Sequence, residues 1–154
     1  MFIPGNDDFN DFVNSIRDVS DDTIIYFDEK LIEVNGLVFA GFGYSNPTPW
    51  HTERELSERG RWPRLLSLLG KLNRNELDKT IAVIHVPPYN TMIDQAPKLT
   101  NDLKPVIEGG VMVMEHAGSI AVREINEQFG PLMSLHGHIH ESPGVDYLNV
   151  RAEY

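Results

Sequence analysis

The sequence predicts an α/β domain in which helices cover one mixed β-sheet. The apolar run 80–84 is typical of a buried parallel strand. The dipeptide Asn35-Gly36 separates two short apolar segments, which indicates a β-hairpin. Apolar residues between Phe9 and Val19 recur at the spacing of an amphipathic helix. A length of 154 residues fits one domain spanning 1–154.

The first half of the chain predicts four elements and a loop. A helix over about 8–19 begins at Asp7 or Asp8, either of which can cap it. A strand over 24–27 and the two strands of the hairpin follow. The next residues are rich in Gly, Pro, Ser and Asn and predict an irregular loop. The predicted hairpin strands and loop cover 31–34, 37–40 and 41–49.

The second half predicts two helices and two strands. A helix begins near Thr52 and is interrupted or restarted at Pro63, since proline lacks an amide hydrogen. Its leucines between 65 and 72 give it a broad core-facing surface. The segment 88–111 is long and weakly patterned, and we expect it to cross the mouth of a site. The remaining predictions are strand 80–84, helix 119–129 and strand 132–135.

Charge and composition exclude several classes of function. The chain has 13 basic and 23 acidic residues, a formal charge of −10, which disfavours nonspecific binding to nucleic acid or anionic membranes. The absence of cysteine excludes disulfides and thiolate ligands. No apolar run has the length of a membrane span, and Phe2-Ile3 is too short for a signal peptide. A cytoplasmic location is therefore the default expectation.

Three histidines lie within five residues in the segment 135–142. His136, His138 and His140 surround Gly137, which allows a tight turn where a strand ends. Neutral imidazole is a good ligand for zinc, manganese and iron. The alternative is one solvated face of a strand. The cluster favours a metal site with nitrogen and oxygen ligands.

Two further segments offer partners for this cluster. His85 follows the buried strand 80–84 directly, at the end where open α/β sheets bind ligands. The N-terminal residues 4–8 contain Asn6 and two aspartates, although alone they fit an ordinary strand–turn–helix junction. His51 and His116 have no comparable context, and we predict that both are surface residues.

Taken in order, the three segments resemble the calcineurin-like metallophosphoesterase family. They read Gly5-Asn6-Asp7-Asp8, then His85-Val86-Pro87-Pro88-Tyr89-Asn90-Thr91, then Gly137-His138-Ile139-His140-Glu141-Ser142. The segments 52–56 and 118–124 are also similar to the family, so the resemblance covers nearly the whole chain.

The resemblance implies a metal-dependent phosphoesterase that hydrolyses phosphomonoesters or phosphodiesters. It implies a sandwich of mixed β-sheets flanked by helices, with two divalent ions (manganese, zinc, iron or nickel) at the site. Asn6, His85 and His138 would bind one ion, and His140 would serve the other. Asp7 is the candidate catalytic residue, because many members carry there a histidine that protonates the leaving group.

The chain also departs from the family pattern. The family opens with Asp-x-His and Gly-Asp motifs, and neither occurs in these 154 residues. We therefore expect the domain to lack its first strand–helix–strand unit, on the order of 30 residues or more. Three hypotheses follow: a phosphoesterase impaired by this loss, a non-catalytic metal-binding remnant, or a half-enzyme completed by a partner chain. The partner would be a second copy in a homo-oligomer or a complementing N-terminal chain. A phosphate ester is the expected substrate, and no residue pattern distinguishes nucleotide, phospholipid and phosphoprotein.

Overall fold

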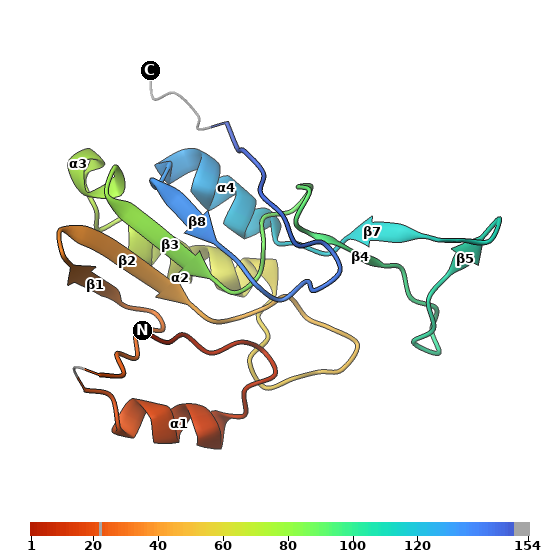
Figure 1. The fold of residues 1–154 in the computed structure, drawn as a ribbon, viewed down its shortest axis with the longest axis horizontal. Helices are drawn as coiled ribbons and strands as arrows, with labels where there is room; N and C mark the ends of the chain where they lie inside the picture. Colours follow the sequence, from red (N-terminus) through yellow and green to blue (C-terminus); the bar gives the residue numbers. More distant parts are fainter. Residues whose placement is uncertain (22, 150–154) are drawn as a thin grey trace.

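The computed structural model describes residues 1–21 and 23–149 as a mixed α/β fold built on a four-stranded sheet (Figure 1). The first two strands are antiparallel, and the last three are parallel to one another. The predicted α/β class with a mixed sheet is confirmed. The strand order is β1 (Leu31–Val34), β2 (Leu37–Phe42), β3 (Thr80–Ile84) and β8 (Met133–Leu135).

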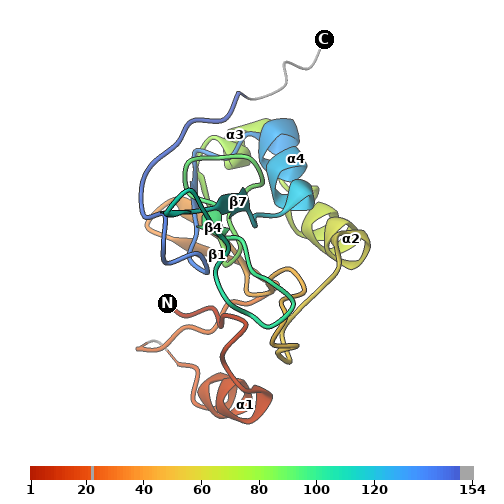
Figure 2. The ribbon, with the colours of Figure 1, turned by 90° about the vertical axis from the view of Figure 1, so that its right-hand side faces the viewer.

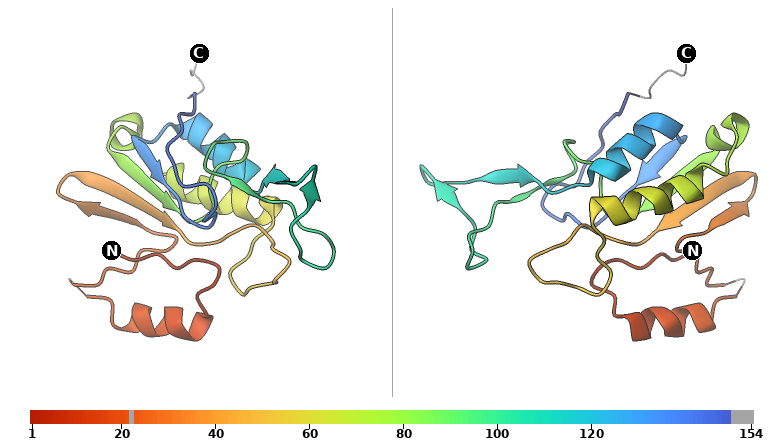
Figure 3. Two further views of the ribbon diagram at one scale, coloured as in Figure 1. Left: turned by 45° about the vertical axis from the view of Figure 1, so that its right-hand side comes forward. Right: turned by 180° about the vertical axis from the view of Figure 1, so that it is seen from behind.

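Two helices cover one face of this sheet. Helices α2 (Glu58–Leu69) and α4 (Ile120–Phe129) lie in front of the strands when the molecule is seen from behind (Figure 3, right). Their apolar side chains meet those of β2 and β3 and exclude water from the core. The core consists of Ala40, Phe42, Leu65, Leu68, Leu69, Ala82, Ile84, Val86, Val122 and Ile125.

Several sequence predictions match these elements closely. Asn35 and Gly36 both have positive φ, 51° and 78°, as a two-residue hairpin turn of this kind requires. Strand β3 has the predicted bounds, and α4 and β8 each begin one residue later than predicted. Ser119 caps α4, since its Oγ accepts a hydrogen bond from the Val122 amide at 3.2 Å.

The N-terminal predictions are wrong in two details. Helix α1 (Asn10–Asp18) begins after Phe9, which provides no side-chain cap, and the Asp8 carboxylate instead accepts a hydrogen bond from the Gly5 amide. The predicted strand 24–27 is reduced to isolated bridges, because Tyr26 pairs only with Phe2. Helix α1 lies apart from α2 and α4 in two perpendicular views (Figures 1 and 2).

The prediction that a helix begins at Thr52 and breaks at Pro63 is also wrong. Helix α2 begins after Ser57, whose side chain accepts a hydrogen bond from the Gly60 amide. Pro63 lies inside α2 on its exposed side. Proline has no amide hydrogen, so the carbonyl one turn earlier in the helix loses its partner. On the exposed side this carbonyl can bond to water, so the helix continues.

The segment 88–111 is not an uninterrupted loop. It contains β4 (Gln95–Pro97) and β5 (Ile107–Glu108), which pair with β7 (Met114–His116) and β6 (Val111–Met112) respectively. Together they form an arm that extends away from the sheet (Figure 1). The short helix α3 (Arg74–Leu77), which precedes β3, has no counterpart in the prediction.

No helix among the described residues is both long enough and apolar enough to cross a membrane.

The core can be tested with two leucines of α2. Leu69 is fully buried, whereas Leu66 on the same helix is 39% exposed. We expect Leu69→Ala to lower the free energy of unfolding by roughly 2–5 kcal/mol, because it leaves a cavity in the core. Leu66→Ala is the matched control, with an expected change within about 0.5 kcal/mol. Urea unfolding followed by circular dichroism measures both, and equal losses would contradict this packing.

Candidate metal centre

Parallel strand pairing brings His85 next to the histidine segment. The His85 amide donates to the Phe42 carbonyl at 2.9 Å, which continues the β2–β3 pairing past the end of β3. The Gly137 amide donates to the His85 carbonyl, also at 2.9 Å, and so continues the β3–β8 pairing. The residues that directly follow β3 and β8 therefore lie side by side and form the start of the site.

One amide oxygen joins the two segments to the N-terminal turn. Asn6 Oδ1 accepts hydrogen bonds from His85 Nε2 and His138 Nδ1, each at 2.9 Å. The two imidazole rings are 5.2 Å apart between centroids. Because a carbonyl oxygen only accepts, each of these ring nitrogens carries the hydrogen in this arrangement. The Asn6 Nδ2 group donates to Asp7 Oδ1, which supports this orientation of the amide.

The backbone at Gly5 makes room for His85. A Cβ atom at Gly5 would lie 2.7 Å from His85 Cε1 and 2.8 Å from Nε2, closer than van der Waals contact permits. His138 itself has φ of 68°, in the left-handed region that non-glycine residues seldom occupy. The site therefore depends on backbone conformations as well as on side-chain types.

Both imidazoles at this site are neutral near pH 7. Burial lowers the pKa of His85 to about 4, and His138, Arg54 and His140 act in the same direction while Asp8 opposes them. Burial also lowers the pKa of His138 below its ordinary value. Neutral imidazole is the form that binds metal ions, and on binding the hydrogen of each nitrogen that faces Asn6 would move to the other nitrogen of its ring.

The donor set fits a single divalent ion. Bonds of about 2.1 Å at right angles place neighbouring ligand atoms about 3.0 Å apart, close to the two separations measured at Asn6. Among residues 1–21 and 23–149, no three His, Cys, Asp or Glu side chains gather closely enough to hold an ion. The set therefore consists of two imidazoles and one amide.

The other predicted site residues lie at the edge of this set. His140 is exposed and lowers the pKa of both His85 and His138 through its charge. Asp7 is exposed as well, accepts the hydrogen bond from Asn6 and raises the pKa of His138 electrostatically. Neither side chain shares the hydrogen bonds at Asn6 Oδ1.

His136 belongs to the fold rather than to the donor set. Its Nδ1 donates to the carbonyls of Ile84 at 2.9 Å and Val86 at 3.1 Å, which ties β8 to the end of β3. Burial lowers the pKa of His136 to about 4. Of the three clustered histidines, this one therefore holds the two strand ends together.

Two buried arginines lie close enough to affect the site. Arg54 forms an ion pair with the buried Asp28 and lowers the pKa of His85. Arg61 is fully buried, donates to Asn46 Oδ1 at 2.6 Å and Ser119 Oγ at 3.1 Å, and lowers the pKa of His138. Carboxylates act on the same imidazoles in the opposite direction: Asp8 raises the pKa of His85, and Asp7 and Glu55 raise that of His138.

Sequence reasoning missed one polar cluster. His116 is not a simple surface residue as predicted, since its Nδ1 lies 2.7 Å from the fully buried Asp94 carboxylate. The two residues are 22 positions apart in the sequence, so local spacing gave no signal. Only the pairing of β4 with β7 brings them together.

The chain is similar to an uncharacterized protein of Methanocaldococcus jannaschii, MJ1162. The two are 30% identical over 148 residues, which cover 95% of this chain and 58% of that protein. The chain thus spans less than two thirds of its relative's length. No protein-family model matches the chain, and no solved structure matches it.

The burial of His136 predicts loss of stability in acid. The pKa of His136 is about 4 in the folded chain, whereas its ordinary value, which applies to the unfolded chain, is 6.5. As the pH decreases, the unfolded chain therefore binds a proton at His136 before the folded chain does. The stabilising effect of neutral His136 is complete above pH 6.5 and falls as the pH decreases toward 4, by up to about 1.4 kcal/mol per pH unit.

His136→Asn places an amide donor near the position of Nδ1 and removes the titration. Urea unfolding of metal-free protein between pH 7 and pH 4.5 should therefore show a shallower pH dependence for His136→Asn than for the wild type. The exposed His51 supplies the control, because His51→Asn should leave the wild-type slope unchanged. Identical slopes for all three proteins would show that His136 titrates normally.

Proposed function

We propose that this chain is a metal-dependent phosphoesterase domain of the calcineurin-like type. The observation that carries the proposal is the meeting of three predicted ligands, Asn6, His85 and His138, at one oxygen atom. These residues come from positions up to 132 apart in the sequence. The family resemblance predicted this combination from motif order alone. The two-sheet sandwich of that family is part of the proposal.

A bound divalent ion would supply Lewis acidity and lower the pKa of a water molecule toward 7. The chain's own residues would hold and orient it: two neutral imidazoles and one amide add no charge, so the ion would keep its full attraction for a phosphate. His140 would contribute to a second ion position. Asp7 is exposed beside Asn6 and is the candidate donor of a proton to the leaving group.

Two buried arginines supply part of the charge around the site. Arg54 and Arg61 both act electrostatically on the imidazoles from buried positions. Their guanidinium groups are fixed by hydrogen bonds and an ion pair, so they raise the local potential without moving. A bound ion would have to supply most of the positive potential that a phosphate ester meets, because Asp7, Asp8 and Glu55 also act on the imidazoles.

A second candidate function is that of a half-enzyme completed by another polypeptide. Exposed apolar side chains favour this function. Near α1, Phe9 is 72% exposed and Phe12 is 49% exposed. On β8, Met133 is 52% exposed and Leu135 is 47% exposed. Among the described residues, no strand pairs with the second edge of β8. An open edge with apolar side chains can accept another chain, either a second copy or a complementing N-terminal chain.

Metal binding tests the proposed ligands directly. Protein loaded with manganese or zinc and then desalted should retain about one ion per chain. We expect His138→Ala to reduce the affinity for the metal ion at least about tenfold, because it removes one of the proposed ligands. His51→Ala is the matched control, since His51 is exposed and outside the site. Calorimetric titration measures the affinities. Equal metal content in the wild type and in a variant with alanine at 85, 138 and 140 would contradict the proposal.

The activity of this chain by itself should be weak. The Asp-x-His and Gly-Asp motifs that complete the second ion position in the family do not occur in these residues. We expect slow hydrolysis of bis(4-nitrophenyl) phosphate with added manganese. The released nitrophenolate is measured by its absorbance at about 400 nm. Adding a family-type N-terminal segment, in cis or as a separate peptide, should raise the rate by orders of magnitude.

Two outcomes would separate the hypotheses. Rapid hydrolysis by the 154-residue chain that His138→Ala abolishes would mean that another carboxylate, such as Asp7 or Asp8, replaces the absent one. No hydrolysis with or without the added segment, combined with normal metal binding, would favour a non-catalytic metal-binding domain. His51→Ala should match the wild type in every assay.

A further inference from the structure

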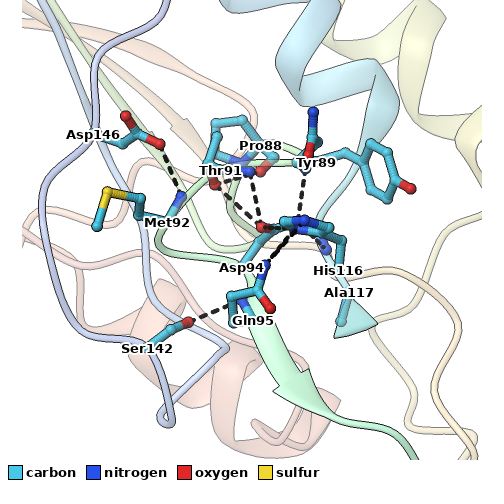
Figure 4. Close-up of polar contacts among 12 residues, drawn as sticks. Pro88, Tyr89, Thr91, Met92, Asp94, Gln95, His116, Ala117, Ser142 and Asp146 are labelled. Carbon is cyan, nitrogen blue, oxygen red and sulfur yellow. Dashed lines mark hydrogen bonds and ion pairs between the residues drawn. The ribbon is translucent and has the colours of Figure 1, made fainter. Parts of the chain in front are cut away.

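A second polar site lies where the arm joins the body of the protein. An open pocket of about 410 Å³ is lined by Asn90, Thr91, Met92, Gln95, His116 and Asp146 (Figure 4). This volume falls within the range of about 300–1,000 Å³ that is usual for small-molecule sites. None of the residues predicted as metal ligands lines it.

Asp94 fixes the orientation of His116 in this pocket. The Asp94 side chain is fully buried and accepts hydrogen bonds from the amides of Asn90, Thr91 and Gly118 at 2.9, 2.9 and 3.1 Å. Its Oδ1 lies 2.7 Å from His116 Nδ1. Because a carboxylate oxygen accepts here, Nδ1 carries the hydrogen, and in the tautomer with its single hydrogen on Nδ1 the other nitrogen, Nε2, is an acceptor.

The second nitrogen of His116 is not needed to hold the arm. The His116 side chain is 31% exposed, and its Nδ1 is already committed to Asp94. The Gln95 amide nitrogen lies 2.9 Å from His116 Nδ1 and 3.0 Å from Nε2, so it covers both ring nitrogens and is not bonded to Nε2 alone. A ligand hydroxyl can replace this amide on Nε2, since Gln95 lines the same pocket and is only half-buried.

The pocket's charge and surfaces limit what it can bind. Its one charged acidic group is Asp146, whose pKa the backbone amides of Met92 and Tyr147 hold below the ordinary value. Neither arginine nor lysine lines it, so it is unsuited to a phosphate group. The Tyr89 ring packs edge-on against His116 with centroids 5.6 Å apart, and Met92 is largely exposed, which gives the rim aromatic and apolar surface.

Two residues beside the pocket belong to segments that continue from the candidate metal centre. Tyr89 follows His85 by four residues, a span of at most about 14 Å. On the other side, the Gln95 amide donates to Ser142 Oγ at 3.0 Å, and Ser142 follows His140 by two residues. One ester could therefore place its phosphate at the imidazoles and its uncharged part in this pocket.

We propose that the pocket around His116 binds an uncharged, hydroxyl-bearing ring, such as a nucleoside, with His116 Nε2 accepting a hydrogen bond from a ligand hydroxyl. Asp94 acts as the positioning residue that fixes the tautomer. The assignment of this ring to the alcohol part of the ester substrate rests on the proposed phosphoesterase function, whereas binding of the ring itself does not.

Thymidine is a suitable probe because it carries a ring and hydroxyls without phosphate. Two-dimensional ¹H–¹⁵N spectra of the imidazoles should show His116 with hydrogen on Nδ1, and thymidine should shift its Nε2 signal saturably. Ribose, which offers hydroxyls without an aromatic ring, should bind at least about tenfold more weakly. A thymidine titration without a saturable shift would overturn the proposal, as would equal affinity for ribose.

Two substitutions separate a ligand-binding role from a structural one. His116→Asn keeps a donor near the Nδ1 position for Asp94 but loses Nε2, so it should retain the melting temperature and lose thymidine affinity at least about tenfold. His116→Gln keeps an amide near the Nε2 position but loses the contact with Asp94, so it should mainly lower the melting temperature. Unchanged thymidine affinity in His116→Asn would assign His116 to the fold alone.

Hydrolysis provides the second readout. With thymidine 5′-(4-nitrophenyl phosphate), His116→Asn should raise KM about tenfold with little change in kcat. With bis(4-nitrophenyl) phosphate, which has no hydroxyl-bearing ring, the same variant should match the wild type. Equal effects on both substrates would overturn the assignment to the substrate's alcohol. Thymidine binding without any hydrolysis, even after the N-terminal segment is added, would refute the phosphoesterase proposal and leave the nucleoside site standing.

Discussion

The parallel pairing of β3 with β2 and β8 is the constraint on which the candidate metal centre depends. It aligns the carboxyl ends of neighbouring strands, so His85 and Gly137 follow their strands at the same edge of the sheet. His136 reinforces this alignment by donating to the carbonyls of Ile84 and Val86, the two neighbours of His85 in the sequence. Without that register, the histidines would be spread along separate loops.

Buried polar groups set the chemistry of this edge. Arg54 donates to Asp28, which precedes β1, whereas Arg61 donates to the Leu56 carbonyl ahead of α2 and to Ser119 at the start of α4. Burial keeps His85 and His138 neutral, while the fixed guanidinium groups offset part of the negative charge of Asp7, Asp8 and Glu55. Neutral ligands leave the charge of a bound metal ion available to an anionic ester.

The fold and the site were predictable where the signal was local. Strand β3, the turn at Asn35-Gly36 and helix α4 could be read from short windows, because apolar runs, left-handed turn residues and a serine cap act within a few residues. The α1 cap and the strand 24–27 were predicted wrongly, since their backbone groups bond to distant partners. The Asn10 amide, for example, donates to the Glu53 carboxylate at 2.9 Å.

The sequence by itself determined which residue types could bind metal and the order in which they occur: Asn6, His85, His138 and His140. Motif order carries that information because each motif is contiguous. Only the tertiary structure decided that three of them meet at Asn6 Oδ1 and that His140 stays outside. It also decided that Asp94 and His116 meet, because a contact between residues 22 positions apart depends on how β4 pairs with β7. Such pairings follow from the packing of the whole chain, which local sequence patterns do not encode.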